Sequence, residues 1–589
     1  MRSFRKILTP ETRLGSWVRL WIPMFMLAIF DVLAAWQDNR YQVFAVDLVI
    51  PIILCVLIAS ITSLIFIKTY RREPLTGFIG ASIATLLFSG DFESRVSSVS
   101  SILKAFNPIH QLYSWESVVY AIIFATLCVF LSLWIGRKVN NFWIHKNWSI
   151  PNFLGGVTVT IGVIFALQAL PVIFSIGSEW QQFSYIPPAL PNTAHVTSDK
   201  GKPDIYYIVL DRYASQSVLQ NQFGYDNSKF ISFLHDQGFS VDPNAHQNYP
   251  YTTMSIASTM NANYLTDIVQ RFGGSSNQTI DPFHQAIRNG AVIQQLKSLG
   301  YTYDELGSWY EASNFSPLAD KLFQPDEQLT IFGETLTVNT FTRNALTSSI
   351  FWRFLQHGLS FGNTDVLTYN TINEVSATQY KLSTLHTLAT QASGGRFIFA
   401  HILVPHDPYY FNADGSLNPN GGNDNVGEQI KQKYVNQVEY INSQITSVIT
   451  DINTASKGNA VVIVQSDEGP YPNFLNDNDS DGTAVDEELA SGSMLDWSNL
   501  DLQMKYGNLA AYKVPAATPE AIQNGGDNVN IFRVVLNSYF NDTLQYLPHC
   551  YYGYKNGREE SFNFTNINQQ LTGSTNPACA PDSNFSKKF

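Results

Sequence analysis

Apolar residues crowd the first 180 positions of the chain and then thin out, and this uneven distribution limits the possible folds more than any other feature. Most of the apolar runs approach the ~20 residues that a helix needs to cross a bilayer. A cleaved signal peptide does not explain the first run, because no small-residue cleavage site follows it and further apolar runs do. We therefore expect five transmembrane helices, in the runs Trp17–Trp36, Val43–Ile67, Thr76–Gly90, Val118–Gly136 and Phe153–Gly177.

The positive residues of this region predict its orientation. Lys and Arg gather before the first run and in the connections after the second and the fourth, namely Arg2, Arg5, Lys6, Arg13, Lys68, Arg71, Arg72, Arg137, Lys138 and Lys146. Such residues mark the cytoplasmic side of a membrane protein. With the N-terminus inside and an odd number of spans, we expect everything after residue 180 to lie outside the cytoplasm.

A polar, Pro-rich segment, "YIPPALPNTAHVTSDKGKP" at 185–203, follows the last run and predicts a linker. We therefore divide the chain into a transmembrane domain at 1–180, a linker at 181–203 and an outer domain at 204–589. In the outer domain, apolar stretches that suit strands, such as "DIYYIVLD" at 204–211, alternate with helical patterns. This alternation predicts an α/β domain whose central sheet is mostly parallel and covered on both faces.

Charge and cysteine usage narrow the partners and the compartment. The formal net charge of −12 argues against a nucleic-acid partner, because nucleic acids bind basic surfaces. Cys550 and Cys579 lie in the predicted outer domain, where disulfides persist, and we expect them to pair in an oxidising compartment. Cys55 and Cys128 fall in predicted spans and are expected to be inert.

Acidic residues stand at the ends of two predicted strands. Asp211 ends "DIYYIVLD", and Asp467 and Glu468 end "AVVIVQSDEG" at 460–469. Ligands bind at the carboxyl edge of an open α/β sheet, so these acids are candidates for a site there. Two neighbouring carboxylates repel each other unless a positive group lies between them, which predicts a cation.

A hydroxyl and two imidazoles complete the set of candidates. In "NYPYTTMSIASTMN" at 248–261, Thr252 could cap a helix running from Thr253. It could also act as a nucleophile, because anions bind well at a helix N-terminus and a metal lowers the pKa of a hydroxyl. In "AHILVPHDPYYF", we expect His401 and His406 to contact the substrate, with His406 placed just after a strand end to meet a phosphate or a metal.

The segments "YYIVLD", "TTMSIA", "PHDPY" and "VVIVQSDEG" stand in the order used by the alkaline phosphatase superfamily. With its apolar N-terminal region, the chain resembles the membrane-anchored sulfatase-like branch, which includes lipoteichoic acid synthases and phosphoethanolamine transferases of bacterial envelopes. The resemblance covers nearly the whole chain. It implies an N-terminal bundle of five transmembrane helices, followed by an extracytoplasmic α/β domain of the alkaline phosphatase type.

The resemblance also implies roles for individual residues. Asp211 and Asp467 match acidic metal ligands, Thr252 matches the covalent nucleophile of the transferases, and His406 matches a histidine that contacts the substrate. Neither C-x-P-x-R nor S-x-P-x-R, the pattern of formylglycine sulfatases, occurs in the chain. We therefore do not expect a sulfatase in the strict sense.

Glu468 departs from the family pattern, because the transferases usually have His at this position. Imidazole suits Zn²⁺, whereas carboxylates suit Mg²⁺, Mn²⁺ or Ca²⁺. We expect one divalent cation of the second kind, bound by Asp211, Thr252, Asp467 and Glu468. The departure also leaves open a loss of activity.

A second metal site is predicted in "DNDSDGTAVDEE" at 477–488, which fits the calcium-loop pattern D-x-[DN]-x-[DN]-G-x₅-E. The expected calcium ligands are Asp477, Asp479, Asp481, the carbonyl of Thr483, and Glu488. A solvated acidic loop is the alternative, since the flanking segments do not predict the two helices of an EF-hand.

These features together predict a transferase in a bacterial cytoplasmic (inner) membrane. We expect it to move a phospho-alcohol head group from a membrane phospholipid to an envelope glycan or lipid through a phospho-threonine at Thr252. A phosphodiesterase or phosphatase, in which water is the acceptor, is the enzymatic alternative. A catalytically silent envelope protein that keeps the fold is the other alternative. The head group, the acceptor and the oligomeric state stay open.

Overall fold

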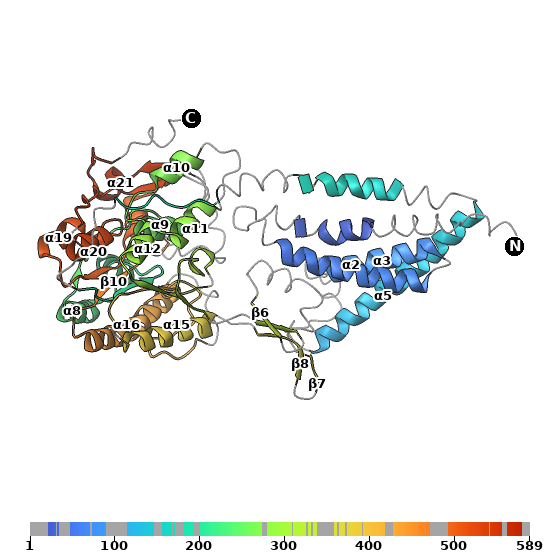
Figure 1. Cartoon of the computed structure of the whole chain (residues 1–589), viewed down its shortest axis with the longest axis horizontal. Coiled ribbons are helices and arrows are strands. Elements are labelled where there is room, and N and C mark those ends of the chain that lie inside the picture. The colour runs from blue at the N-terminus through green and yellow to red at the C-terminus, as the bar shows by residue number, and fades with distance from the viewer. Residues whose placement is uncertain are drawn as a thin grey trace. The chain divides into compact units, whose positions relative to one another are not determined.

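The computed structural model describes most of the chain after residue 200 and a smaller part of the chain before it (Figure 1). The described residues are 22–30, 32–33, 48–70, 73–89, 115–146, 156–167, 169–170, 182, 184–191, 201–273, 280–308, 310–324, 328–331, 334–337, 359–361, 364–370, 374–391, 393–418, 428–471, 493–540, 542–555 and 562–579. The chain divides into two compact units, one of Met1–Trp180 with Asp326–Thr371 and one of Gln181–Pro325 with Ile372–Phe589. No pattern in the sequence predicted that 326–371 would join the first unit.

The first unit contains three long helices and a small sheet. The helices α2 (Val49–Thr69), α3 (Pro74–Ser89) and α5 (Trp115–His145) overlap the second, third and fourth predicted spans, and α3 packs against both of the others. An added Cβ at Gly80 of α3 would come within 2.8 Å of Phe66 and 2.9 Å of Leu133, so a glycine is needed for this close packing. The antiparallel sheet has the order β6-β5-β8-β7, with β5 at Gln328–Ile331, β6 at Glu334–Thr337, β7 at Leu359–Phe361 and β8 at Thr364–Asn370.

In the part of the chain that the structure describes, no helix is both long enough and apolar enough to cross a membrane. The predicted bundle of five spans is therefore not confirmed.

The second unit is built on a seven-stranded sheet with the strand order β2-β11-β10-β1-β9-β3-β4. The strands are β1 (Ile205–Leu210), β2 (Ser240–Val241), β3 (Thr302–Leu306), β4 (Lys321–Phe323), β9 (Arg396–Ile402), β10 (Val461–Gln465) and β11 (Ala510–Lys513). The five strands from β10 to β4 run parallel, whereas β11 and β2 are antiparallel at one edge. The mostly parallel α/β sheet predicted from the sequence is confirmed.

Both faces of this sheet are covered by helices, as near-continuous apolar strands require. Tyr207 and Val209 of β1 belong to one apolar cluster, and Tyr206 and Ile208 to another, because side chains alternate between the faces of a strand. The first cluster includes residues of α9 (Thr252–Met260), α11 (Asp281–Arg288), α12 (Ala291–Ser298) and α20 (Ile531–Phe540). The second includes residues of α7 (Gln216–Phe223), α8 (Ser228–Asp236), α15 (Glu374–Ala389) and α16 (Glu428–Ser456).

Shorter elements complete the second unit. They are α10 (Thr266–Phe272), α18 (Asn499–Tyr506), α19 (Pro519–Gly525), α21 (Asn568–Thr572), the 3₁₀ helices η3 (Glu311–Ser313) and η5 (Met494–Asp496), and the hairpin of β12 (Tyr552–Tyr554) with β13 (Phe564–Asn566). Cys550 and Cys579 form a disulfide with their Cα atoms 5.6 Å apart, which is the pairing that the sequence predicted.

Candidate metal centre

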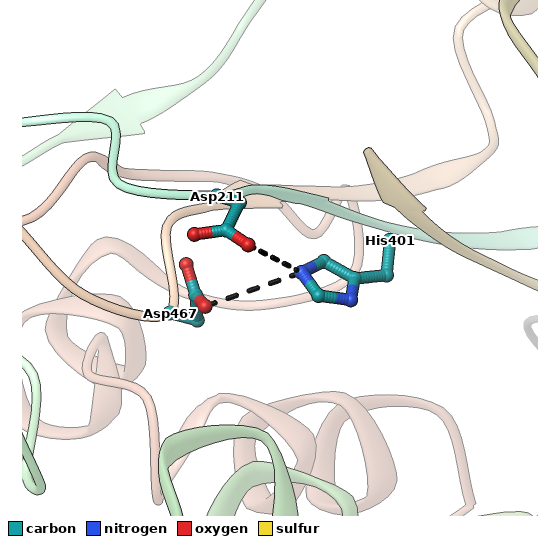
Figure 2. Close-up of side chains that lie close together, drawn as sticks. All are labelled: Asp211, His401 and Asp467. Atoms are coloured by element: carbon teal, nitrogen blue, oxygen red, sulfur yellow. Dashed lines mark ion pairs between the residues drawn. The ribbon is translucent and has the colours of Figure 1, made fainter. Parts of the chain in front are cut away.

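Three side chains converge at the carboxyl edge of the large sheet (Figure 2). They are Asp211, His401 and Asp467, and one potential ligand atom of each lies within 4.8 Å of the other two. The Nε2 atom of His401 lies 3.4 Å from Oδ2 of Asp211 and 4.0 Å from Oδ2 of Asp467. All three residues are buried. Two carboxylates and one imidazole so arranged could hold a divalent cation.

The register of three parallel strands brings these residues together. Val209 of β1 lies opposite His401 of β9 on one side and opposite Gln465 of β10 on the other. Asp211 and Asp467 each follow that level by two residues, so the two acids emerge side by side. We expected His401 to contact the substrate, but the structure places it with the two acids. The sequence could not show this, because it does not contain the register between strands.

Hydrogen bonds on the far side of the His401 ring hold it in place. The Ser308 hydroxyl donates to the backbone oxygen of Tyr310, at 3.3 Å. The Ser313 hydroxyl lies 3.0 Å from Ser308 Oγ and 2.8 Å from His401 Nδ1. When Nδ1 carries the proton and donates it to Ser313, Nε2 presents a lone pair to Asp211 and Asp467, which is the tautomer that a bound metal requires. Holding the outer nitrogen in this way is how proteins orient a metal-binding histidine.

The polar atoms that face one another here lack partners within the protein. Among the described residues, none forms a hydrogen bond with Asp211 Oδ1, His401 Nε2 or Asp467 Oδ2, although all three atoms are buried. Buried polar groups are nearly always satisfied, so three buried polar atoms without partners at one point fit a cation. The donor set of two oxygens and one nitrogen also fits a divalent metal.

The pKa values agree with a site that needs positive charge. Burial raises the pKa of Asp467 well above its usual range, and the carboxylates of Asp211 and Glu468 raise it further, while the Thr252 hydroxyl opposes the rise. Burial also acts to raise the pKa of Asp211, but His406 and His401 outweigh it and lower that pKa. Burial lowers the pKa of His401, so its ring is neutral and can act as a ligand. Without a cation, the two acids share a single negative charge.

Thr252 and His406 lie close to this centre. Thr252 is the first residue of α9, is buried, and interacts with Asp467. The helix begins one residue earlier than the sequence predicted, with Tyr251 as the N-cap. His406 is near enough to Asp211 to lower the pKa of that acid, and its Nδ1 lies 3.3 Å from Oδ1 of Asp407. His406 is partly exposed, so it is open to a substrate.

Glu468 has cationic partners in place of a metal. Its Oε1 accepts a hydrogen bond from Arg212 Nε at 2.9 Å, and its Oε2 accepts one from Lys505 Nζ at 2.8 Å. We expected Glu468 to be a metal ligand, but it does not belong to the converging group. Arg212 and Lys505 were missed in the sequence analysis. Arg212 directly follows Asp211, which could have drawn attention to it, whereas Lys505 lies in α18 with no local signal.

The predicted calcium loop at 477–488 lies outside the described residues, and with it Asp477, Asp479, Asp481, Thr483 and Glu488. Cys55 and Cys128 form no disulfide with any residue that the structure describes.

Comparison with known proteins places the second unit in a family. Residues 203–506, just over half of the 589-residue chain, match the family model described as Sulfatase. A search of curated proteins finds no match.

Several solved structures are similar at low identity. The C-terminal periplasmic domain of EcEptC from Escherichia coli, in complex with Zn, is 12% identical with a TM-score of 0.33, and the match covers 62% of this chain and 88% of that one. The protein yidJ from Bacteroides fragilis is 11% identical with a TM-score of 0.34, covering 62% and 83%. A 2-O GAG sulfatase is 8% identical with a TM-score of 0.37, covering 61% and 79%. Similarity of this degree identifies no activity.

Proposed function

The chain belongs to the sulfatase family, and from that premise we propose that it moves a phospho-alcohol head group from a membrane phospholipid to an envelope glycan or lipid through a covalent phospho-threonine at Thr252. The observation that carries the proposal is the convergence of Asp211, His401 and Asp467 beside a hydroxyl at the start of α9. A divalent cation bound by these three residues would supply a Lewis acid for a phosphoryl oxygen and lower the pKa of the hydroxyl.

The roles of the protein's own residues follow from their positions. Thr252 Oγ would form the bond to phosphorus as the bond from phosphorus to the diacylglycerol oxygen breaks. In this proposal, Asp467, which interacts with the Thr252 hydroxyl, would accept its proton. His406, partly exposed and near Asp211, would protonate the departing oxygen. A hydroxyl of the acceptor would then take the phospho-alcohol from Thr252 and restore the free threonine.

The donor set bears on the choice of cation. We expected Mg²⁺, Mn²⁺ or Ca²⁺ because the predicted ligands were all oxygens. The nitrogen of His401 in the converging group favours a cation that accepts both nitrogen and oxygen. Of the three, Mn²⁺ fits best, and Zn²⁺ fits the same set.

A membrane anchor would explain a lipid donor, and we include the five spans and the bacterial inner membrane in the proposal. Its support is the series of apolar runs and the surface of the described helices. Ile53 and Leu57 of α2 and Leu127 and Phe130 of α5 are each more than half exposed. Large apolar side chains facing outward in this way suit contact with lipid.

The test is intact mass spectrometry of the full chain extracted in detergent. We expect a phospho-alcohol adduct on Thr252, whose mass would name the head group, and no adduct in Thr252→Ala. Thr266→Ala is the matched control, since Thr266 also begins a helix, α10, and is not among the residues of the candidate metal centre. Turnover that survives in Thr252→Ala would overturn the covalent route. An adduct that transfers only to water would make the protein a hydrolase.

A further inference from the structure

Arg212 is held on three sides beside the candidate metal centre. Its Nε donates to Glu468 at 2.9 Å, and its Nη1 donates to Asp407 at 2.6 Å. Its guanidinium carbon lies 4.5 Å from the centre of the Tyr471 ring. The third nitrogen, Nη2, donates to none of the residues that the structure describes, and the side chain keeps 15% of its surface exposed. The guanidinium is thus fixed in position with one donor edge left over.

The backbone of Arg212 is strained, and the strain lies next to a candidate metal ligand. Its φ is +58°, in the left-handed region that residues other than glycine rarely adopt. Its N–H donates to Asp467 Oδ1 at 3.3 Å, and its carbonyl accepts from the Tyr434 hydroxyl at 2.8 Å. Such conformations persist where the surroundings enforce them, and they cluster at functional sites.

Glu468 and Asp407 balance the charge around Arg212. Glu468 is shared between Arg212 and the buried Lys505, whose Nζ lies 3.5 Å from the centre of the Tyr471 ring. Asp407 is shared between Arg212 and His406. Two cations therefore face two carboxylates, which orients the guanidinium without leaving a surplus of negative charge to repel an anion. For Glu468 to turn toward a metal, it would have to leave the ammonium of Lys505 buried and unpaired.

We propose that Arg212 binds an oxygen of the tetrahedral oxyanion that occupies this site, with Glu468 and Asp407 as its positioning residues. A guanidinium presents parallel donors that match phosphate and sulfate oxygens, and it stays charged when partly buried. The ligand is a phosphate or sulfate ester group, the class on which the proposed reaction depends, so this inference rests on the proposed function. It adds the residue that recognises the group and gives Glu468 a role other than metal binding.

The alternative is that Arg212 only ties the segments around Asp407 and Glu468 together. The two readings differ in oxyanion affinity. The test measures binding of inorganic phosphate, and separately of sulfate, to the manganese-loaded full chain in detergent by calorimetry. We expect Arg212→Gln to weaken binding of the preferred ion about 10-fold to 100-fold, as removing a hydrogen bond to a charged group does. Arg212→Lys should bind the ion more weakly than the parent protein and more tightly than Arg212→Gln, because it keeps the positive charge but loses the paired N–H donors of the guanidinium. Asp407→Asn should weaken binding less than Arg212→Gln.

The matched control is Arg271→Gln, because Arg271 also pairs with an acid, Asp267, and lies 5.6 Å from a tyrosine ring, that of Tyr185. Bound manganese, measured by elemental analysis, should be the same in all these proteins. Unchanged phosphate and sulfate affinity in Arg212→Gln at equal metal content would overturn the proposal, even if the melting temperature fell. If Arg212→Gln does not fold, the same measurement is made on Arg212→Lys, and unchanged phosphate and sulfate affinity in that variant would overturn the proposal.

The two ions separate the possible sources of the ligand. Tighter binding of phosphate would support a phosphate ester as the ligand of Arg212. Tighter binding of sulfate would support a sulfate ester as its ligand. Since the measurement needs no turnover, a missing adduct on Thr252 would remove the proposed transfer and leave this result standing.

Discussion

The Nζ atom of Lys505 lies 2.8 Å from Oε2 of Glu468, and the Lys505 side chain is fully buried. The other carboxylate oxygen of Glu468 contacts Arg212. Asp467 and Glu468 are adjacent in the sequence, but their carboxylates lie in different surroundings. Glu468 is neutralised by two side chains of the protein, whereas Asp467 faces Asp211 and His401, where a cation fits.

The first prediction concerns Glu468→His, which would restore the usual transferase residue. From the sequence, this change should shift metal preference toward Zn²⁺. From the structure, it should leave Lys505 without its counter-ion and lower the free energy of unfolding by about 3–5 kcal/mol, the cost of breaking a buried pair. Thermal unfolding and metal analysis of the full chain check this. Glu520→His, at an exposed position in the first turn of α19, is the control. Unchanged stability with a stoichiometric gain of zinc would favour the sequence-based expectation.

Much of the site could be predicted because it depends on where elements end. Asp211 and Asp467 follow apolar strands, and Thr252 begins a helix, so local patterns located all three. The role of His401 depends on its pairing opposite Val209, which no local pattern contains. Glu468 is paired by Lys505 of α18, 37 residues further along the chain, and by Arg212, 256 residues before it. The antiparallel edge of β11 and β2 was likewise not predicted, since their order in the sheet is set by tertiary packing.

The second prediction concerns the hydroxyl that orients His401. Ser313→Ala removes the hydroxyl that bonds to Nδ1 and leaves the ring without its outer partner. Loss of such an outer partner typically weakens metal binding about 10-fold to 100-fold. Competition with a chelator on the full chain measures this affinity. Ser298→Ala is the control, because its hydroxyl bonds only within α12. Equal affinities in the parent protein and Ser313→Ala would contradict the role of Ser313 in orienting His401.

The third prediction concerns the disulfide. The bond closes a loop with a sequence separation of 29, so replacing both Cys550 and Cys579 by serine should cost ~3–4 kcal/mol of stability. Turnover should fall as well, because the segment before Thr252 is bound to this region. Asn248 donates to the carbonyl of Cys550 at 3.0 Å and accepts from the N–H of Tyr552 at 3.0 Å.

Thermal unfolding with and without a thiol reductant measures the first effect. Cys128→Ser, which removes a free thiol, is the control. The difference in melting temperature between this variant and the parent protein should be the same with and without the reductant. Full turnover in the double serine variant would show that the C-terminal hairpin does not position Thr252.

The last prediction concerns Glu305, which is buried at the end of β3 with an Oε2 that bonds to none of the described residues. Burial raises its pKa from 4.5 to about 8, so the folded protein holds a proton that the unfolded chain releases. Stability is then greatest below the unfolded pKa and falls as pH rises toward 8. Between about pH 5 and 6.5, the parent protein should lose about 2 kcal/mol relative to Glu305→Gln, which has no proton to release. Lys381, whose pKa burial lowers to about 7, stays largely charged in this range. Thermal unfolding of both proteins across this range measures the difference, with the exposed Glu439→Gln as control. Parallel pH profiles for the parent protein and Glu305→Gln would show that Glu305 is ionised in the folded state.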